Sequence, residues 1–137
     1  MLFISKLYKY LYTIAPASVT LFSWLNPPRP MWFSKGNSLS VIRGFPAEVR
    51  ENLGADLRRL QNGERPLDSG SMSPALPGVF ELRDQDKATW YRVLYVKMGG
   101  RVYVLHCFTK KTNQTPKGDI EIGRKRLSDL KQRLAKH

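Results

Sequence analysis

Residues 88–111, ATWYRVLYVKMGGRVYVLHCFTKK, decide the fold. Two runs rich in aromatic and β-branched residues flank the pair Gly99–Gly100. Such runs favour strands, and paired glycines supply the positive φ angles that a tight hairpin turn needs. Arg92 interrupts the first run, although a strand that is buried in a core seldom carries an arginine. The stretch therefore predicts a β-hairpin around which the rest of the chain is built.

A two-residue loop at Gly99–Gly100 also predicts the pairing register of the hairpin. Arg92 then faces Cys107, and directly paired residues share a face of the sheet while faces alternate along each strand. A one-residue slip in either strand would exchange these faces. The register predicts Arg92 and Lys111 on one face, and His106, Lys110, Tyr91, Val93 and Val104 on the other.

The composition is strongly basic. The chain has 137 residues, which suit a single domain with a modest core. It carries 23 lysines and arginines against 11 acidic residues, for a formal net charge of +12. This balance points to a polyanionic partner such as nucleic acid, the ribosome, an acidic membrane or an acidic protein. A soluble basic domain without such a partner is the alternative.

The residues that carry common enzyme chemistry are scarce. Cys107 is the only cysteine, so an internal disulfide is impossible, which fits a reducing compartment. One cysteine with His106 and His137 does not make a zinc site. The sequence also lacks a phosphate-binding Walker loop, a dinucleotide fingerprint, a nucleophile elbow and a zinc-protease helix. We therefore expect neither a metal nor a small-molecule cofactor.

The first 29 residues differ from the rest. They contain no acidic residue, and the uncharged run 10–25 is broken by Pro16 and is short for a membrane-spanning helix. Three interpretations stay open: translation that begins near Met31, a signal or membrane anchor, and a genuine extra element. The proline-rich stretch 26–30 indicates a break. We thus expect an atypical extension over 1–29 and one folded domain over 30–137.

Patterns outside the hairpin predict the remaining elements. We expect a short strand at 30–34, a helical turn at 38–43 with Ser38 as its N-cap, and a helix at 47–61 that ends at Asn62–Gly63. Residues 64–78 are expected to form a loop with little regular structure, followed by a strand at 79–84. A basic helix is expected at 119–136.

The order of these elements predicts an α+β fold, with a helical hairpin packed on one face of a small, mostly antiparallel sheet and a C-terminal helix. The opposite sheet face is expected to be open and positively charged.

Four segments together resemble a known superfamily. They are FPAEVRENLGADLRRLQNG (45–63), LPGVFELR (76–83), YRVLY (91–95) and VYVLHCFTKKTNQTP (102–116). In order and spacing they resemble the RelE/ParE toxins, with the phage-derived HigB-like branch as the closest match, over about residues 30–133. The resemblance implies a RelE-like fold and a toxin of a type II toxin–antitoxin system. RelE-type relatives enter the ribosomal A site and cut mRNA without a metal. The implied partners are mRNA on the ribosome and a cognate antitoxin, expected to be a helix-turn-helix protein. The implied location is the cytoplasm, away from membranes.

Metal-free RNA cleavage sets clear chemical requirements. Attack of a 2′-hydroxyl on the adjacent phosphorus needs a base, positive charge around the phosphorane and a proton for the leaving oxygen. By the resemblance, Arg92 matches the arginine of the family's YR strand, and Arg83 lies where relatives keep a basic strand residue. Lys111 matches the basic residue just past the final strand, with Lys110 as a close alternative. Three such cations around one phosphate would depress a lysine pKa. The expected catalytic residues are Arg83, Arg92 and Lys111, with Lys110, His106 and Glu81 in RNA-binding or supporting roles.

Other interpretations compete with each assignment. Arg92 can pair with Glu81 across the sheet, since a four-residue turn at 85–88 would place the two residues opposite each other. Arg83 can be a solvated edge residue, and His106 can be a hydrogen-bonded core residue. Tyr91 and Phe108, which this register opposes, are expected to be core aromatics rather than base-stacking platforms. The C-terminal aromatic or acidic residue that nuclease relatives often use has no match here except Asp119. Two other functions stay open: a ParE-like, non-enzymatic gyrase inhibitor, and an RNA-binding regulatory module.

Overall fold

The computed structural model describes residues 32–34 and 36–136. The predicted extension over 1–29, with its three interpretations, lies outside these residues. Within the described ranges, no helix has both the length and the apolar character that crossing a membrane requires.

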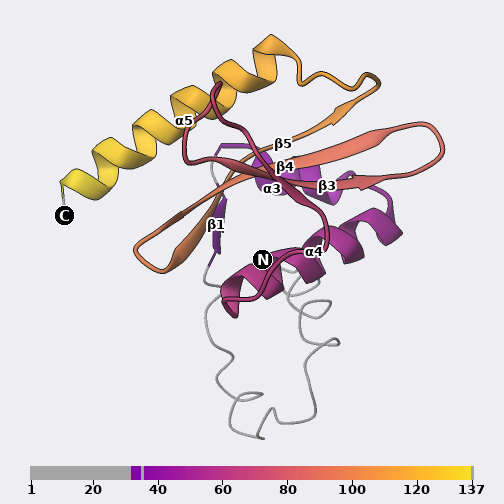
Figure 1. Cartoon of the computed structure of the whole chain (residues 1–137), viewed down its shortest axis with the longest axis horizontal. Coiled ribbons are helices and arrows are strands. Elements are labelled where there is room, and N and C mark those ends of the chain that lie inside the picture. The colour runs from indigo at the N-terminus through magenta and orange to yellow at the C-terminus, as the bar shows by residue number, and fades with distance from the viewer. Residues whose placement is uncertain (1–31, 35, 137) are drawn as a thin grey trace, which may run out of the picture.

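The centre of the molecule is one five-stranded sheet in the order β1-β5-β4-β3-β2. Strand β1 pairs in parallel with β5, and every other pair is antiparallel. The strands are β1 (Trp32–Ser34), β2 (Ser69–Ser71), β3 (Phe80–Gln85), β4 (Trp90–Met98) and β5 (Arg101–Lys110). Helices flank both faces of this sheet, so the predicted α+β class is confirmed (Figure 1).

Strand β2 lies in the stretch that was expected to have little regular structure. Its three residues, Ser-Gly-Ser, lack the β-branched and aromatic side chains that favour strands. The strand exists because its backbone pairs with β3, with Gly70 opposite Glu81. Tertiary pairing therefore overrides local preference at this sheet edge.

Two helices precede the main strands and pack on one face of the sheet. Helix α3 (Ser38–Arg43) and helix α4 (Ala47–Gln61) have the predicted bounds. The apolar positions of α4 at helical spacing are buried, and the helix ends before Gly63, whose φ angle is +75°. The expected N-cap of α3 was wrong. Asn37 precedes the helix, and Ser38 is buried in its first turn, where its hydroxyl donates to the carbonyl of Leu105 at 3.0 Å.

Helix α5 (Lys117–Ala135) covers part of the other face, so the expectation of a fully open face was wrong. Figure 1 shows α4 and α5 on opposite sides of the sheet. The α4 side holds one core, which includes Leu53, Leu57 and Tyr91. The α5 side holds a second core, built from β4, β5, α5 and the loop between β2 and β3. Toward the β3–β4 turn, this second face carries charged side chains instead of core residues.

The β4–β5 hairpin has the predicted turn but a different register beyond it. Met98 pairs with Arg101, and Gly99 and Gly100 have φ angles of +58° and +74°. The pairing shifts between Leu94 and Tyr95, because Leu105 is an extra residue in β5. This β-bulge shifts every pair on the side of the bulge away from the Gly99–Gly100 turn. Arg92 pairs with Phe108 instead of Cys107, and Trp90 pairs with Lys110 instead of Thr109. The predicted faces are therefore exchanged: Arg92 shares its face with His106 and Lys110.

The bulge is held by side chains from distant parts of the chain. The carbonyl of Leu105 accepts hydrogen bonds from Ser38 Oγ at 3.0 Å and from Arg126 Nη1 at 2.9 Å. Arg126 Nη2 also donates to Asn37 Oδ1 at 2.8 Å. Arg126 therefore ties α5, the start of α3 and the bulge together.

Removing the Arg126 guanidinium is expected to destabilise the fold measurably. Arg126→Ala removes charged hydrogen bonds to a buried carbonyl, and we expect the free energy of unfolding to fall by about 2 kcal/mol. Lys125→Ala, an exposed neighbour on the same helix, is the matched control and should stay within about 0.5 kcal/mol of the wild type. Urea denaturation monitored by circular dichroism measures both. Equal midpoints for the two variants would show that Arg126 does not stabilise the bulge.

Candidate functional site

Four charged side chains from three neighbouring strands meet on the α5 face of the sheet, toward the β3–β4 turn. Glu81 and Arg83 lie two residues apart on β3 and so share a face. Arg83 pairs directly with Arg92 on β4. Lys110 pairs with Trp90, two residues along from Arg92, and therefore faces the same way. We call Glu81, Arg83, Arg92 and Lys110 the basic cluster.

The carboxylate of Glu81 lies between the two arginines. Its Oε1 accepts from Arg83 Nε at 2.9 Å, and its Oε2 lies 3.6 Å from Arg92 Nε. The side chains of Glu81 and Arg92 are only 8% and 12% exposed, whereas that of Arg83 is 37% exposed. Like charges directly opposite on adjacent strands repel each other. The contact expected between Arg92 and Glu81 thus exists, but the expectation that they lie directly opposite each other was wrong, since Arg83 pairs with Arg92 and Glu81 pairs with Leu94. One carboxylate therefore compensates two arginines.

Lys110 is a buried amine in a positive environment. Its Nζ donates to the carbonyl of Asn113 at 3.1 Å. Burial lowers the pKa of Lys110, Arg92 and Arg83 lower it further, and Glu81 opposes them. Burial likewise lowers the pKa of Arg92, against the attraction of Glu81. A lysine of lowered pKa has more of its amine in the neutral form, which can accept a proton.

Lys111 lies just past the end of β5 and is exposed. The shared face that the sequence predicted for Lys111 and Arg92 was wrong, because the bulge at Leu105 advances β5 by one residue. The alternative residue, Lys110, occupies that position. A catalytic role for Lys111 stays a prediction that the register does not favour.

His106 is a buried, hydrogen-bonded residue. Its Nε2 lies 2.7 Å from Asp119 Oδ1, and its Nδ1 lies 3.3 Å from Arg126 Nη1. Its ring stacks on Phe108, with centroids 5.2 Å apart. An arginine only donates, so Nδ1 accepts and Nε2–H donates to the carboxylate. Asp119, which had no assigned role, therefore joins α5 to β5. This network holds the His106 ring and the Phe108 ring stacked on it, and Phe108 pairs with Arg92 of the basic cluster.

The two aromatic residues expected to oppose each other lie on different faces. Tyr91 pairs with Thr109 and packs against Phe45 in the α4 core, with ring centroids 4.9 Å apart. Phe108 pairs with Arg92 and lies in the α5 core. The predicted opposition was wrong because of the bulge, but both residues are buried, as expected for core aromatics.

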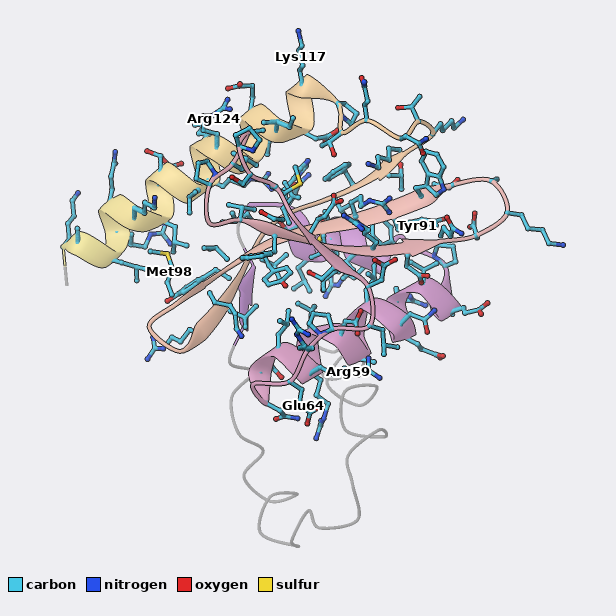
Figure 2. The ribbon with its side chains drawn as sticks, in the orientation of Figure 1. Arg59, Glu64, Tyr91, Met98, Lys117 and Arg124 are labelled. Atoms are coloured by element: carbon cyan, nitrogen blue, oxygen red, sulfur yellow. The ribbon has the colours of Figure 1, made fainter. Side chains whose placement is uncertain are left out.

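A pocket adjoins the basic cluster at the edge of β3. It has a volume of about 390 Å³ and extends between β3, helix α4 and the loop that precedes β2. Arg83 and Arg92 belong to both the cluster and the pocket. Figure 2 shows Arg59, another lining residue, on α4 on the far side of the sheet from Arg124 of α5. Other polar lining residues are Asn52, Asp56, Asp68, Asp84 and Gln85.

The sequence did not predict this pocket. Its walls come from four segments that are separated along the chain, namely α4, residues 67–68, β3 and β4. The spacing of charges along α4 indicated only a solvated outer face. Asp84 was counted as a strand residue, and nothing in its local pattern distinguishes it from other exposed acidic residues.

Among residues 32–34 and 36–136, no group of three or more histidine, cysteine, aspartate or glutamate side chains is placed to hold a metal ion.

A comparison with protein families finds one match. A family model described as "Phage derived protein Gp49-like (DUF891)" matches residues 40–128, which is more than half of the chain. The match includes α4, the β4–β5 hairpin, all four residues of the basic cluster and the first part of α5. None of the curated proteins matches the chain.

Proposed function

The chain belongs to the Gp49-like family of phage-derived proteins, a family of RelE-like, toxin-like proteins, and we propose that it is the toxin of a type II toxin–antitoxin pair that cuts mRNA on the ribosome. The observation that carries this proposal is the basic cluster. It gathers two arginines and a lysine of lowered pKa on one face of the sheet. These groups supply the base and the positive charge that metal-free RNA cleavage needs.

In the proposed reaction, the 2′-hydroxyl of the bound RNA attacks the adjacent phosphorus. The neutral amine of Lys110 accepts the hydroxyl proton as the new O2′–P bond forms. Arg92 and Arg83 donate hydrogen bonds to the phosphorane oxygens, whose negative charge grows in the transition state. The O5′–P bond then breaks, and the leaving oxygen takes a proton from water. The products are a 2′,3′-cyclic phosphate and a free 5′-hydroxyl, and Lys110 returns its proton to solvent.

Glu81 has a supporting role in this reaction. It accepts from Arg83 and attracts Arg92, so both guanidinium groups are held before RNA arrives. A preorganised charge stabilises a transition state without the cost of reorganising at the moment of reaction. We therefore assign Glu81 to positioning, since a carboxylate next to the phosphate would itself be repelled.

We also propose a cognate antitoxin, a helix-turn-helix protein with an acidic surface. A chain of net charge +12 attracts RNA and other polyanions, and a partner that covers the basic cluster would prevent this. An acidic surface would complement the cluster and speed association.

A translation assay tests the proposed function. Purified full-length protein is added to ribosomes that translate a defined mRNA, and primer extension maps the ends, with gyrase supercoiling measured in parallel. New ends that require ribosomes, together with growth arrest on expression, are the expected result. Gyrase inhibition without cleavage would move the function to the ParE-like class. RNA binding without either activity would indicate an RNA-binding regulatory module.

The lowered pKa of Lys110 predicts the pH dependence of cleavage. The protonated amine is inactive as a base, so the single-turnover rate should rise with pH until Lys110 has lost its proton, below the usual lysine pKa of 10.5. Lys110→Arg keeps the charge but stays protonated throughout, so its residual rate should lack this rise. Quench-flow cleavage on stalled ribosomes from pH 6 to 9 measures both. A parallel rise in the variant would assign the pH dependence to another group.

A further inference from the structure

The pocket at the edge of β3 has no role in the reaction described above, and we infer that it binds the nucleobase next to the scissile phosphate and prefers bases with an exocyclic amino group over uracil. This inference rests on the proposed function, because it places RNA on the basic cluster. It adds a specificity site that the cleavage chemistry does not require.

The position of the pocket follows from two shared residues. Arg83 and Arg92 line the pocket and also belong to the basic cluster. A phosphate held by these two guanidinium groups therefore lies at the mouth of the pocket. The nucleoside joined to that phosphate is within reach of the pocket, and the volume of about 390 Å³ falls in the range of small-molecule sites.

The charges of the two sites place the phosphate of the nucleotide on the basic cluster and its base in the pocket. The basic cluster has three cations and one carboxylate, so it carries net positive charge and suits a phosphate. The pocket lining instead balances its charges and suits a neutral polar group. Its three arginines are Arg59, Arg83 and Arg92, and its three aspartates are Asp56, Asp68 and Asp84.

Asp84 supplies the acceptor that selects the base. Its Oδ2 accepts from Asn52 Nδ2 at 3.0 Å, and its Oδ1 accepts from the backbone N–H of Gln85 at 2.9 Å. These bonds hold the carboxylate in one orientation, and each oxygen retains capacity for a further donor. Adenine, cytosine and guanine each present an amino group, whereas uracil presents two carbonyl oxygens around a single N–H. A fixed carboxylate therefore favours the amino-bearing bases.

Arg59 supplies a surface on which a base can stack. Its Nη1 is held by Asp56 Oδ1 at 2.7 Å, and that same oxygen accepts from the backbone N–H of Leu67 at 2.9 Å. The Oδ1 atom of Asp56 thus joins Arg59 to the backbone of Leu67 and holds the guanidinium group at the pocket wall. Guanidinium planes are common stacking partners for unpaired RNA bases. Leu67, at the rim, is 80% exposed and adds apolar contact area.

Binding of uncleavable RNA tests the inference without relying on catalysis. The probes are short fluorescent oligomers of adenosine, cytidine or uridine with every 2′-hydroxyl replaced by hydrogen, and anisotropy gives the dissociation constants for the full-length protein. The wild type should bind the adenosine and cytidine oligomers about tenfold more tightly than the uridine oligomer. Asp84→Asn presents an amide in place of the carboxylate and should bring the three affinities close together.

Asp129→Asn is the matched control, because it makes the same change of charge at an exposed position on α5. It should leave the preference among the three oligomers unchanged. Ala55→Leu, on the α4 wall, is a second pocket variant that narrows the space without touching a charge, and it should also reduce the preference. A melting curve for each variant confirms that the fold is intact.

The outcomes separate the two proposals. Equal affinities of the wild type for all three oligomers, with binding lost in Arg92→Ala, would overturn the base pocket and leave the nuclease assignment standing. The base pocket is also overturned if Asp84→Asn and Ala55→Leu both keep the wild-type preference. Absence of oligomer binding by a wild type that still cuts mRNA on ribosomes would overturn the base pocket alone. Absence of both binding and cleavage would overturn the base pocket and the proposed function together.

Discussion

Lys110→Ala is expected to slow mRNA cleavage on the ribosome by about a hundredfold or more, the usual cost of losing one preorganised group in such a site. Lys111→Ala should change the rate by less than about threefold, because an exposed charge outside the site contributes mainly to salt-dependent binding. The two lysines are adjacent in the sequence and have the same chemistry. Their difference comes only from the β-bulge at Leu105, which directs Lys110 toward Arg92.

Single-turnover primer extension on stalled ribosomes measures this contrast. Each lysine variant is the control for the other, since both lose one positive charge at the end of β5. Their circular dichroism spectra should match that of the wild type. If Lys111→Ala removes activity while Lys110→Ala retains it, the base lies in the loop after β5 and the basic cluster only binds RNA.

The parts of the fold that the sequence predicted depend on local chemistry. The turn at Gly99–Gly100 needs positive φ angles that glycine provides, and its position agreed with the prediction. The bounds of α4 also agreed, since Pro46 precedes the helix, apolar residues recur at helical spacing and Gly63 follows its end. Neither feature requires knowledge of a distant residue.

The register of β5 was mispredicted because its cause is not local. The carbonyl of Leu105 is satisfied by Ser38, 67 positions earlier, and by Arg126, 21 positions later. A pattern of alternating side chains in β5 does not indicate these hydrogen bonds. Without knowledge of them, a register with no bulge is the simplest expectation. Strand β2 escaped prediction for a related reason, since its Ser-Gly-Ser sequence becomes a strand only beside β3.

The candidate site was predicted in part for the same reasons. Arg83 and Arg92 lie together as expected, because they pair directly across β3 and β4 and so point to the same face of the sheet. The partner lysine changed from Lys111 to Lys110 with the register. Glu81 was expected as a supporting residue opposite Arg92, but the turn between β3 and β4 spans residues 86–89 instead of 85–88. Glu81 therefore pairs with Leu94, and its carboxylate lies between both arginines.

The stability of the basic cluster should depend on Glu81 more than on any one cation. Glu81→Ala would leave Arg92 largely buried, opposite Arg83 and near Lys110, with only the exposed carboxylate of Asp68, which pairs with Arg83, to compensate. Breaking one side of a buried ion pair typically costs about 3 kcal/mol. We therefore expect the melting temperature to fall by about 10 °C, given the entropy of unfolding of a domain of this size. Calorimetry and urea denaturation both measure the loss.

A double-mutant cycle separates the loss of a partner from the loss of packing. Arg92→Met keeps an apolar stem of similar length, and the double variant Glu81→Leu with Arg92→Met should recover most of the stability lost in the single variant Glu81→Leu, because buried ion pairs are often replaceable by apolar residues. Glu121→Ala, at an exposed pair with Arg124, is the matched control and should cost less than about 0.5 kcal/mol. Additive costs in the double variant would show that Glu81 and Arg92 contribute independently. If the double variant instead regains stability, the arginines of the cluster lower stability unless the glutamate lies between them. The proposed reaction needs these same arginines.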